Sequence, residues 1–211
     1  MKKNKVNVIG FGGHSKVVED ILINNGYKEI NYYDDKFSQI KYKNKNFYQN
    51  TILKFIQSAN KEIDVFIAIG DNKIRKKIFT KLVKYYDYNF PTLIDKNSIV
   101  SKFAQIDKGS VVMPGVVINH SAKIGSQSII NTKASLDHEN EIGNFVHIGP
   151  GSCLAGKVIV KDLCFLGTGT IVINNIKIEK NTRTFAGTIV TKDLKGNRSY
   201  FFKKGELSFK I

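Results

Sequence analysis

Cysteine, proline and tryptophan are scarce or absent in this chain of 211 residues, which has two cysteines, three prolines and no tryptophan. Two cysteines cannot form the disulfide framework of a small secreted domain, so we interpret Cys153 and Cys164 as small core residues of a reduced, cytoplasmic protein. No apolar run approaches the roughly 18 residues that cross a bilayer, so no integral membrane segment is expected. The short run VNVI after the basic start breaks at Gly10, which predicts a strand and not a secretory signal.

Arginine and acidic residues are also few. Of 33 basic residues only Arg75, Arg183 and Arg198 are arginine, and 18 acidic residues leave a net charge of +15. The lysines are scattered and form no block. Either the whole sequence is compositionally rich in lysine, or the charge attracts anionic ligands such as nucleotides, or an anionic membrane surface. No nucleic-acid partner is expected, because neither a recognised binding module nor a basic helix is visible.

The clearest pattern present is a repeat of six residues from Ile99 to Leu194, in sixteen consecutive hexads without an insertion. The second place of the hexad is aliphatic in fifteen of the sixteen, the exception being Thr184. Each hexad predicts one short strand with an inward aliphatic side chain and one corner, so that the chain forms a stacked β-coil. Small residues are expected at the tight corners, namely Gly109, Gly115, Gly151, Gly169 and Gly187.

These hexads resemble the hexapeptide-repeat family of left-handed parallel β-helices. The resemblance implies that three hexads form one triangular coil. It also implies an acyltransferase that uses acetyl- or succinyl-CoA and works as a homotrimer, with its active sites in the clefts between neighbouring prisms. The repeat specifies the fold more strongly than it specifies the chemistry.

The N-terminal third alternates strands, turns and helices. Residues 6–9 predict a strand, followed by the glycine-rich turn GFGGHS and a helix over 16–25 with Ser15 as its N-cap. Further strands over 30–33 and 65–69 and a helix over 73–86 complete a small parallel α/β sheet, although the turn departs from the G-x-G-x-x-G fingerprint. Ligands of such sheets lie beyond the carboxyl ends of the strands. That edge is where Gly12, Gly13, His14, Asp34, Asp35 and Gly70 fall, unless these residues only shape the loops.

The segment SLDHENEIGNFVHIGPGS contains the residues best suited to catalysis. His138 is followed by Glu139, and His147 comes nine residues later. Acyl transfer from a thioester needs a base with a pKa near 7, for which imidazole is suited, and a neighbouring carboxylate can orient it. The glycine-rich corners can supply amide donors to an oxyanion. Alternatively, His138 is a corner residue that faces solvent; His120, 18 residues earlier, should stack beside it as possible support.

Three coil histidines also suggest zinc, because the γ-class carbonic anhydrases use this fold with three histidines. Their spacing has two histidines about five residues apart, whereas the gaps here are 18 and 9. We therefore expect no metal.

The blocks GFGGHS, FIAIGDNKIRKK and DHENEIGNFVHIG together resemble one branch of the family, over most of the chain from Lys5 to Leu194. That branch contains bacterial nucleotide-linked 4-amino-sugar N-acetyltransferases and related sialic-acid O-acetyltransferase-like enzymes. The resemblance implies a nucleotide-sugar-binding α/β domain over 1–95, a left-handed β-helix over 96–194 and a tail over 195–211. It implies acetyl-CoA as cosubstrate, a dTDP- or UDP-linked 4-amino-4,6-dideoxy sugar as acceptor, and a place in O-antigen or other surface-glycan synthesis.

The resemblance also assigns roles to residues. It implies His138 as general base, Glu139 as its supporting carboxylate, and the Gly156 amide as the oxyanion donor. The implied contacts to acetyl-CoA are His147 at the thioester, Gly156, and Thr168 and Ala186 along the pantetheine arm. The implied nucleotide-sugar pocket consists of Gly12, Gly13, His14, Asp34, Asp35 and Gly70.

Two features depart from the branch or leave the function open. The branch commonly ends in a G-V-P-A-K type segment that closes over CoA, whereas this chain ends in GNRSYFFKKGELSFKI. The contacts to the adenine end, and the packing of the aromatic tail, therefore stay open. O-acetylation of a sialic-acid-like sugar is a close alternative. A non-enzymatic trimeric scaffold is an alternative of another class.

Overall fold

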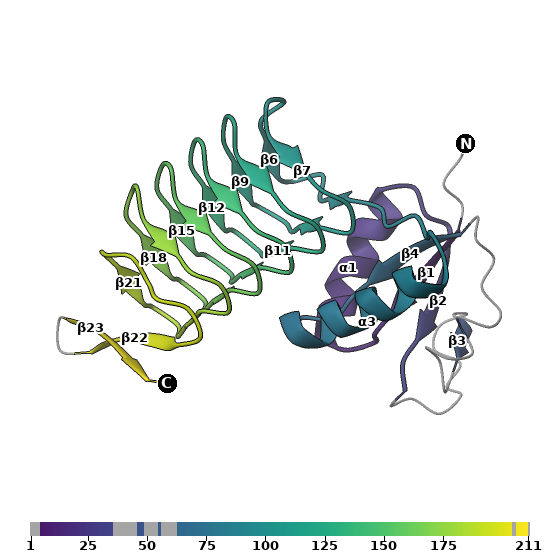
Figure 1. The fold of residues 1–211 in the computed structure, drawn as a ribbon. Coiled ribbons are helices and arrows are strands. Elements are labelled where there is room, and N and C mark those ends of the chain that lie inside the picture. The colour runs from purple at the N-terminus through teal and green to yellow at the C-terminus, as the bar shows by residue number, and fades with distance from the viewer. Residues whose placement is uncertain (1–4, 36–45, 49–54, 56–62, 204–205, 211) are drawn as a thin grey trace. The chain divides into compact units, whose positions relative to one another are not determined.

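The chain forms two compact units, residues 1–93 and 94–211 (Figure 1). The computed structural model describes residues 5–35, 46–48, 55, 63–203 and 206–210. Each unit is described by itself below.

The N-terminal unit contains a parallel sheet of four strands in the order β3-β2-β1-β4. A cluster of buried apolar side chains from β1, β4 and α3, including Ile9, Ile67 and Leu82, forms its core. This agrees with the expected alternation of strands and helices, and strand β3 adds an element that the sequence pattern did not predict. The elements are β1 (Lys5–Ile9), α1 (Gly13–Asn24), β2 (Glu29–Tyr33), β3 (Asn46–Tyr48), β4 (Asp64–Ile67) and α3 (Asn72–Tyr85).

Helix α1 begins earlier than the sequence indicated. Its N-cap is Gly12, which makes no side-chain cap hydrogen bond, so the prediction of Ser15 as N-cap is wrong. Ser15 lies inside the first turn, where its buried hydroxyl donates back to the carbonyl of Gly12 at 2.7 Å. The glycine turn therefore leads directly into the helix, and its N-cap residue Gly12 has no side chain to cap the first helical amides.

The C-terminal unit is a parallel β-helix of two-residue strands, which confirms the prediction that each hexad forms one short strand and one corner (Figure 1). Its strands form three sheets, which we call the β6–β21 face, the β7–β19 face and the β5–β23 face after their outermost members. The strands are β5 (Leu93–Ile94), β6 (Ile99–Val100), β7 (Gln105–Ile106), β8 (Val111–Val112), β9 (Val117–Ile118), β10 (Lys123–Ile124), β11 (Ile129–Ile130), β12 (Ser135–Leu136), β13 (Glu141–Ile142), β14 (His147–Ile148), β15 (Cys153–Leu154), β16 (Ile159–Val160), β17 (Phe165–Leu166), β18 (Ile171–Val172), β19 (Lys177–Ile178), β20 (Arg183–Thr184) and β21 (Ile189–Val190).

Residues 18 apart stack on one another. Ser135 of β12, for example, pairs with Val117 of β9 and with Cys153 of β15. The second residue of most strands is buried inside the coil, as with Leu136 at 1% exposure. The five predicted corner glycines all have positive φ, between 63° and 71°. Non-glycine residues also take this conformation at other corners, among them Glu139 at φ 58°.

The two cysteines differ in environment. Cys164 is buried, as expected, and its thiol donates to the carbonyl of Glu179 at 3.0 Å. Cys153 is exposed, so its interpretation as a core residue is wrong. It occupies the first place of its hexad, and the alternation along a strand turns that place away from the coil interior.

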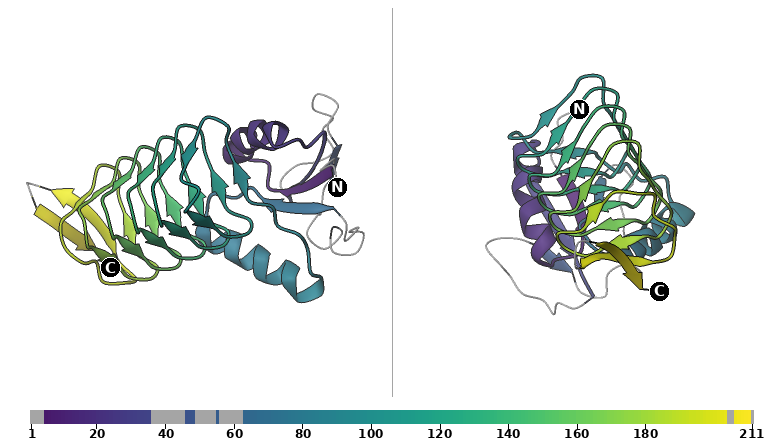
Figure 2. Two further views of the ribbon diagram at one scale, coloured as in Figure 1. Left: turned by 90° about the horizontal axis from the view of Figure 1, so that it is seen from above. Right: turned by 90° about the vertical axis from the view of Figure 1, so that its left-hand side faces the viewer.

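The tail forms a hairpin of β22 (Ser199–Lys203) and β23 (Glu206–Lys210), which extends the β5–β23 face beyond the last coil (Figure 2). Tyr200 anchors it and is 5% exposed. Its hydroxyl accepts from the backbone N–H of Lys195 at 2.9 Å and donates to the Lys195 carbonyl at 3.1 Å. Through these hydrogen bonds, Tyr200 of the aromatic tail is anchored to the backbone of Lys195.

Candidate active site

His138 lies at the corner between β12 and β13, where the β6–β21 face meets the β7–β19 face. Its Nδ1 is 3.1 Å from Oε1 of Glu139, and each of the two side chains is about half exposed. Lys157 Nζ is 3.9 Å from Oε2 of the same carboxylate. The backbone of Glu139 is left-handed, with φ at 58°. The pair predicted from sequence is therefore formed.

Gly156 stacks one coil beyond His138 and is buried. A Cβ atom at this glycine would lie 2.6 Å from both Cε1 and Nε2 of His138. The imidazole thus occupies the space that any side chain at residue 156 would need. The structure brings His138, Glu139 and Gly156 together as the sequence predicted.

Asp137 fixes the corner that presents His138. Its Oδ1 accepts from the backbone N–H of His138 at 2.8 Å and from Nδ2 of Asn119 at 3.0 Å. These two hydrogen bonds, the first being the stronger influence, lower the pKa of the Asp137 carboxyl. Sequence reasoning missed Asp137 and Asn119, although their separation of 18 residues could have indicated stacked partners.

His120 stacks beside His138 through the backbone, since the N–H of Glu139 donates to the carbonyl of His120 at 3.0 Å. Its side chain has other partners among the described residues. Nδ1 lies 2.6 Å from the hydroxyl of Ser121, and the ring packs on Phe103 with centroids 4.3 Å apart. None of these contacts of the His120 side chain is with the His138 imidazole, so they do not bear out the predicted support of His138 by His120.

His147 lies on the β5–β23 face and is 8% exposed. Its Nε2 is 2.9 Å from the amide nitrogen of Asn131, and its ring meets Phe165 edge-on with centroids 4.8 Å apart. Because an amide nitrogen only donates, Nε2 accepts this bond, which favours the neutral imidazole. His147 is thus suited to positioning rather than to proton transfer through Nε2.

Thr168 and Ala186 lie on a different edge of the prism from His138. They occupy the corners after β17 and β20, where the β5–β23 face meets the β6–β21 face, and both are exposed. One chain therefore does not bring these residues to the same edge as the His138–Glu139 pair.

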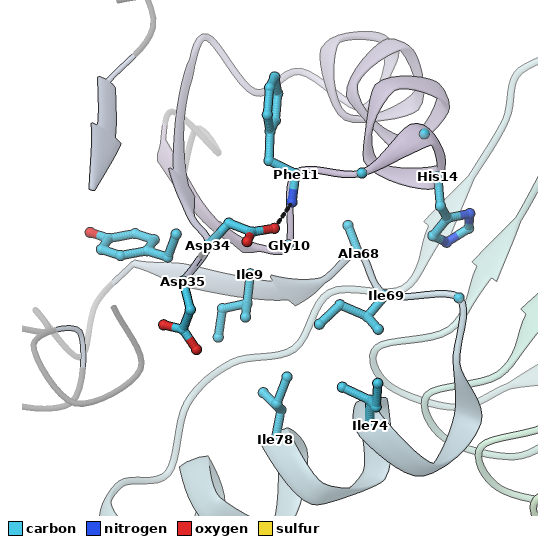
Figure 3. Close-up of a pocket in the computed structure, with 14 residues that line it drawn as sticks. Ile9, Gly10, Phe11, His14, Asp34, Asp35, Ala68, Ile69, Ile74 and Ile78 are labelled. Atoms are coloured by element: carbon cyan, nitrogen blue, oxygen red, sulfur yellow. Dashed lines mark hydrogen bonds between the residues drawn. The ribbon is translucent and has the colours of Figure 1, made fainter. Parts of the chain in front are cut away.

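The six predicted pocket residues of the N-terminal unit do come together, around a cavity of about 540 Å³ (Figure 3). Oδ2 of Asp34 accepts from the backbone N–H of Phe11 at 2.8 Å and so ties β2 to the glycine-rich turn. Asp35 is exposed at the rim. In Figure 3, Ile74 and Ile78 project from α3 toward the cavity. The lining has an apolar wall, which includes Ile74 and Ile78. Polar residues and glycines, the predicted set, make up another part of the lining: Gly12, Gly13, His14, Asp34, Asp35 and Gly70.

Arg75, which sequence reasoning missed, holds one wall of this cavity in place. It is 1% exposed, and its Nη1 donates to the carbonyls of Ile69 and Gly70 at 2.8 and 3.1 Å. Its Nη2 donates to Asn72 Oδ1 at 2.8 Å. Burial lowers the pKa of Arg75 to about 9, so the guanidinium is still charged at neutral pH. A buried arginine in an amphipathic helix gives no distinctive sequence signal.

Burial, and secondly the charge of Arg75, lowers the pKa of His14 from 6.5 to about 4. Its buried Nε2 has no hydrogen-bond partner among the described residues. The folded protein thus holds this imidazole neutral at pH values where an unfolded chain would protonate it.

Replacing His14 by glutamine should therefore flatten the acid dependence of stability. Between about pH 6.5 and pH 4 the unfolded wild-type chain binds the extra proton, so its free energy of unfolding falls as the pH falls. The contribution of His14 is at most about 3 kcal/mol. Urea unfolding at pH 7, 5.5 and 4.5 measures it, with the exposed His120→Gln as control. Equal slopes for wild type and His14→Gln would show that His14 is not responsible.

Within the described residues, no three His, Cys, Asp or Glu side chains are grouped so that they could hold a metal ion. The same part of the chain contains no helix with the length and apolarity to span a membrane.

Comparison with known proteins identifies the family. Residues 5–82 match the family model described as the PglD N-terminal domain. The UDP-N-acetylbacillosamine N-acetyltransferase of Bacillus subtilis (strain 168) is 34% identical over 111 residues, and the match spans about half of each protein, 51% of this chain and 50% of that one. The acetyltransferase domain of PglB from Neisseria gonorrhoeae FA1090 is 29% identical with a TM-score of 0.88, covering 94% of this chain and 97% of that one.

PerB from Caulobacter crescentus, solved in complex with CoA and GDP-perosamine, is 31% identical with a TM-score of 0.86 over 97% of both chains. The chain belongs to the hexapeptide-repeat sugar N-acetyltransferases. This membership confirms the predicted acyltransferase class. It also confirms the predicted fold, in which a parallel-sheet α/β domain precedes a left-handed β-helix. The PglB domain has also been solved with acetyl coenzyme A.

Proposed function

We propose that this sugar N-acetyltransferase transfers the acetyl group of acetyl-CoA to the 4-amino group of a nucleotide-linked 4-amino-4,6-dideoxy sugar. The observation that carries the proposal is the His138 imidazole, paired with Glu139 and seated over Gly156. Two relatives support an amino-sugar acceptor: one is named UDP-N-acetylbacillosamine N-acetyltransferase, and the other was solved in complex with CoA and GDP-perosamine. A dTDP- or UDP-linked sugar, used in the cytoplasm for surface-glycan synthesis, is the specific form that we propose.

The geometry suggests which atoms act. Because a carboxylate oxygen accepts hydrogen bonds, Nδ1 of His138 carries the proton and donates to Oε1 of Glu139. Nε2 is then the basic atom. Nε2 takes a proton from the sugar amine as the amine nitrogen attacks the thioester carbonyl. The new C–N bond forms, the C–S bond then breaks, and the imidazolium returns the proton to the departing thiolate. The products are an amide and free CoA.

Gly156 has the features of an oxyanion donor. Its N–H makes no hydrogen bond to the described residues, and its missing side chain lets the His138 ring lie directly beside this backbone, so that the amide and Nε2 are close neighbours. A backbone donor that is already in position stabilises negative charge on the carbonyl oxygen without further reorganisation.

We propose that the complete site is shared between subunits of a homotrimer. The His138 edge and the Thr168–Ala186 edge flank the same β6–β21 face. That face exposes apolar side chains, including Ile99 at 70% and Ile171 at 47% exposure. If this face packs about a threefold axis, symmetry places the His138 edge of one subunit beside the Thr168–Ala186 edge of the next. The pantetheine arm would then lie along the second edge, with His147 near the thioester.

The N-terminal cavity suits the nucleotide part of the acceptor. Its volume is in the range of pockets for small ligands, and the N-terminus of α1 opens onto it without an acidic residue in the first turn. The amides of Gly12 and Gly13 can therefore bind phosphate. His14 Nε2 and Asp35 can bind polar groups of the ligand, while Ile74 and Ile78 offer an apolar surface.

The function is tested by incubating the protein with acetyl-CoA and a panel of UDP-, dTDP- and GDP-linked 4-amino sugars while following free thiol. We expect thiol release that depends on one amino-sugar nucleotide and matches amide formation mole for mole. A sialic-acid-like hydroxyl acceptor as the better substrate would support O-acetylation. Binding of neither acetyl-CoA nor any acceptor would contradict the enzyme proposal.

A further inference from the structure

Helix α3 carries a disproportionate share of the chain's positive charge. Its 14 residues include six basic residues and no acidic one. The chain average, 33 basic residues among 211, is far lower. Helix α1, with 12 residues, has one lysine and two acidic residues. Helix α3 is therefore a basic helix, contrary to the expectation from sequence, and the lysine-rich composition of the chain does not account for it.

The lysines of α3 gather on one side of the helix, because residues three and four apart share a face. The buried residues lie on one side, namely Asn72, Arg75, Ile78 and Leu82. The opposite side carries five lysines, all exposed or partly exposed, which we call the α3 lysine face: Lys73, Lys76, Lys77, Lys81 and Lys84. At a rise of 1.5 Å per residue this face is roughly 16 Å long.

These lysines repel one another within the helix. Lys77 is four residues from both Lys73 and Lys81, a spacing at which like charges destabilise a helix. Lys73 also lies in the first turn, where the helix dipole disfavours a cation. Over the described part of the chain, no carboxylate forms an ion pair with any lysine of the face. Because the arrangement is unfavourable for the fold alone, it indicates an external anionic partner.

The composition of the face favours a lipid surface over nucleic acid. Its cations are all lysine, whereas Arg75, the arginine of this helix, is 1% exposed and donates to neighbouring carbonyls. Arginine is the residue best suited to bidentate contacts with phosphates and base edges. Val83 and Tyr85, at the C-terminal end of the helix, are 43% and 52% exposed. Such side chains can enter the headgroup region of a bilayer.

The length of the face points in the same direction. Five lysines spread over three turns of a helix exceed what one diphosphate group can contact. They fit an extended surface of negative charge, to which each lysine contributes separately. The buried side of α3 holds the helix in the core of the N-terminal unit through Ile78 and Leu82. The helix can therefore present its lysines to a surface without leaving the fold.

We propose that the α3 lysine face docks on an anionic lipid bilayer as a reversible, peripheral contact. The ammonium groups bind the negatively charged headgroups, and Val83 and Tyr85 enter the headgroup region beside them. This inference is independent of the proposed function, because it concerns a surface of α3 and not acetyl transfer. It assigns a role to part of the net charge of +15.

Co-sedimentation of the full chain with vesicles tests the inference. One set of vesicles contains phosphatidylcholine alone, and the other contains phosphatidylcholine mixed with phosphatidylglycerol. We expect binding only to the anionic vesicles, and we expect it to weaken as salt is raised, because the Debye length falls from about 10 Å at 0.1 M to about 3 Å at 1 M. Replacing the five lysines of the face by glutamine should weaken binding by at least about 100-fold, since each contributes about fivefold.

A matched variant separates the face from the net charge. It replaces five exposed lysines of the β-helix by glutamine and so has the same net charge as the α3 variant: Lys108, Lys123, Lys133, Lys161 and Lys192. We expect it to bind anionic vesicles within about threefold of wild type, since lysines far from the bilayer are screened. Thermal melting checks that both variants are folded, and the α3 variant should be at least as stable as wild type because the like-charge pairs are gone.

Three results would overturn the inference. The first is failure of wild type to bind anionic vesicles. The second is an equal loss of binding in the two variants, which would assign the effect to net charge. The third is tighter binding of wild type to double-stranded DNA than to anionic vesicles at the same salt, with that binding lost in the α3 variant. None of these results bears on thiol release from acetyl-CoA, so the proposed function stands or fails separately.

Discussion

Replacing His138 by alanine is expected to lower kcat by about 10²–10⁴-fold, the range over which a general base accelerates proton transfer. The imidazole that should accept the amine proton is lost, whereas the groups proposed to bind the substrates are not. CoA affinity should therefore stay within about twofold of wild type. Initial rates of thiol release at saturating acetyl-CoA, with CoA affinity measured separately by calorimetry, would show the two effects independently.

Two further variants calibrate this result. Glu139→Gln keeps the shape of the side chain but removes the charge beside Nδ1, so we expect a smaller loss, of about tenfold, because the pair is half exposed. His120→Ala should leave kcat nearly unchanged, since the His120 ring contacts Phe103 and Ser121. A loss of less than about tenfold in His138→Ala would exclude a general-base role for that imidazole.

Gly156→Ala should reduce kcat by about 10²-fold in a protein that still folds. The added methyl group would stand 2.6 Å from Cε1 and Nε2 of His138, so the ring must move. The backbone of Gly156 is outside the left-handed region, and alanine therefore adds no backbone strain. The loss should appear in kcat, with the melting temperature changed by only a few degrees.

A double variant separates displacement of the ring from other effects of the methyl group. With His138→Ala already in place there is no imidazole to displace, so adding Gly156→Ala should cost much less than it does alone. Wild-type activity of Gly156→Ala would contradict the close approach on which this account depends. Full additivity would show that the glycine acts independently of the His138 ring.

The hexad repeat let the sequence predict most of the β-helix, because a period of six places one inward side chain and one corner in every repeat. The same period predicts which residues stack, and so it places Gly156 beside His138. The parallel sheet of the N-terminal unit, and the gathering of its six pocket residues at one edge, follow from the order of strands and turns.

Other features depend on contacts that leave no sequence pattern. Asp137 holds the His138 corner through hydrogen bonds that an aspartate could equally make to water. Arg75 reads as one more basic residue on a helix, although its guanidinium is buried. Cys153 was misplaced because a first-place residue faces outward whatever its polarity, and the hairpin pairs the tail through backbone contacts outside the repeat.

The separation of the His138 edge from the Thr168–Ala186 edge could be predicted only by placing each corner on a face of the prism. Because the two edges lie apart in one chain, the proposed mechanism requires a site that is shared between two subunits. A subunit-mixing experiment tests that requirement directly, using His138→Ala and Ala186→Trp, the second of which should block the pantetheine edge without touching the base.

Each variant alone should be nearly inactive, since every site in its trimer lacks one component. Co-expressed with different tags and purified as mixed trimers, the two variants should recover about one third of wild-type kcat per subunit, because one of the three shared sites in each mixed trimer has both components intact. The account predicts this recovery in acetyl-CoA-dependent thiol release. Mixed trimers as inactive as the single variants would show that each subunit builds its site alone and would contradict it.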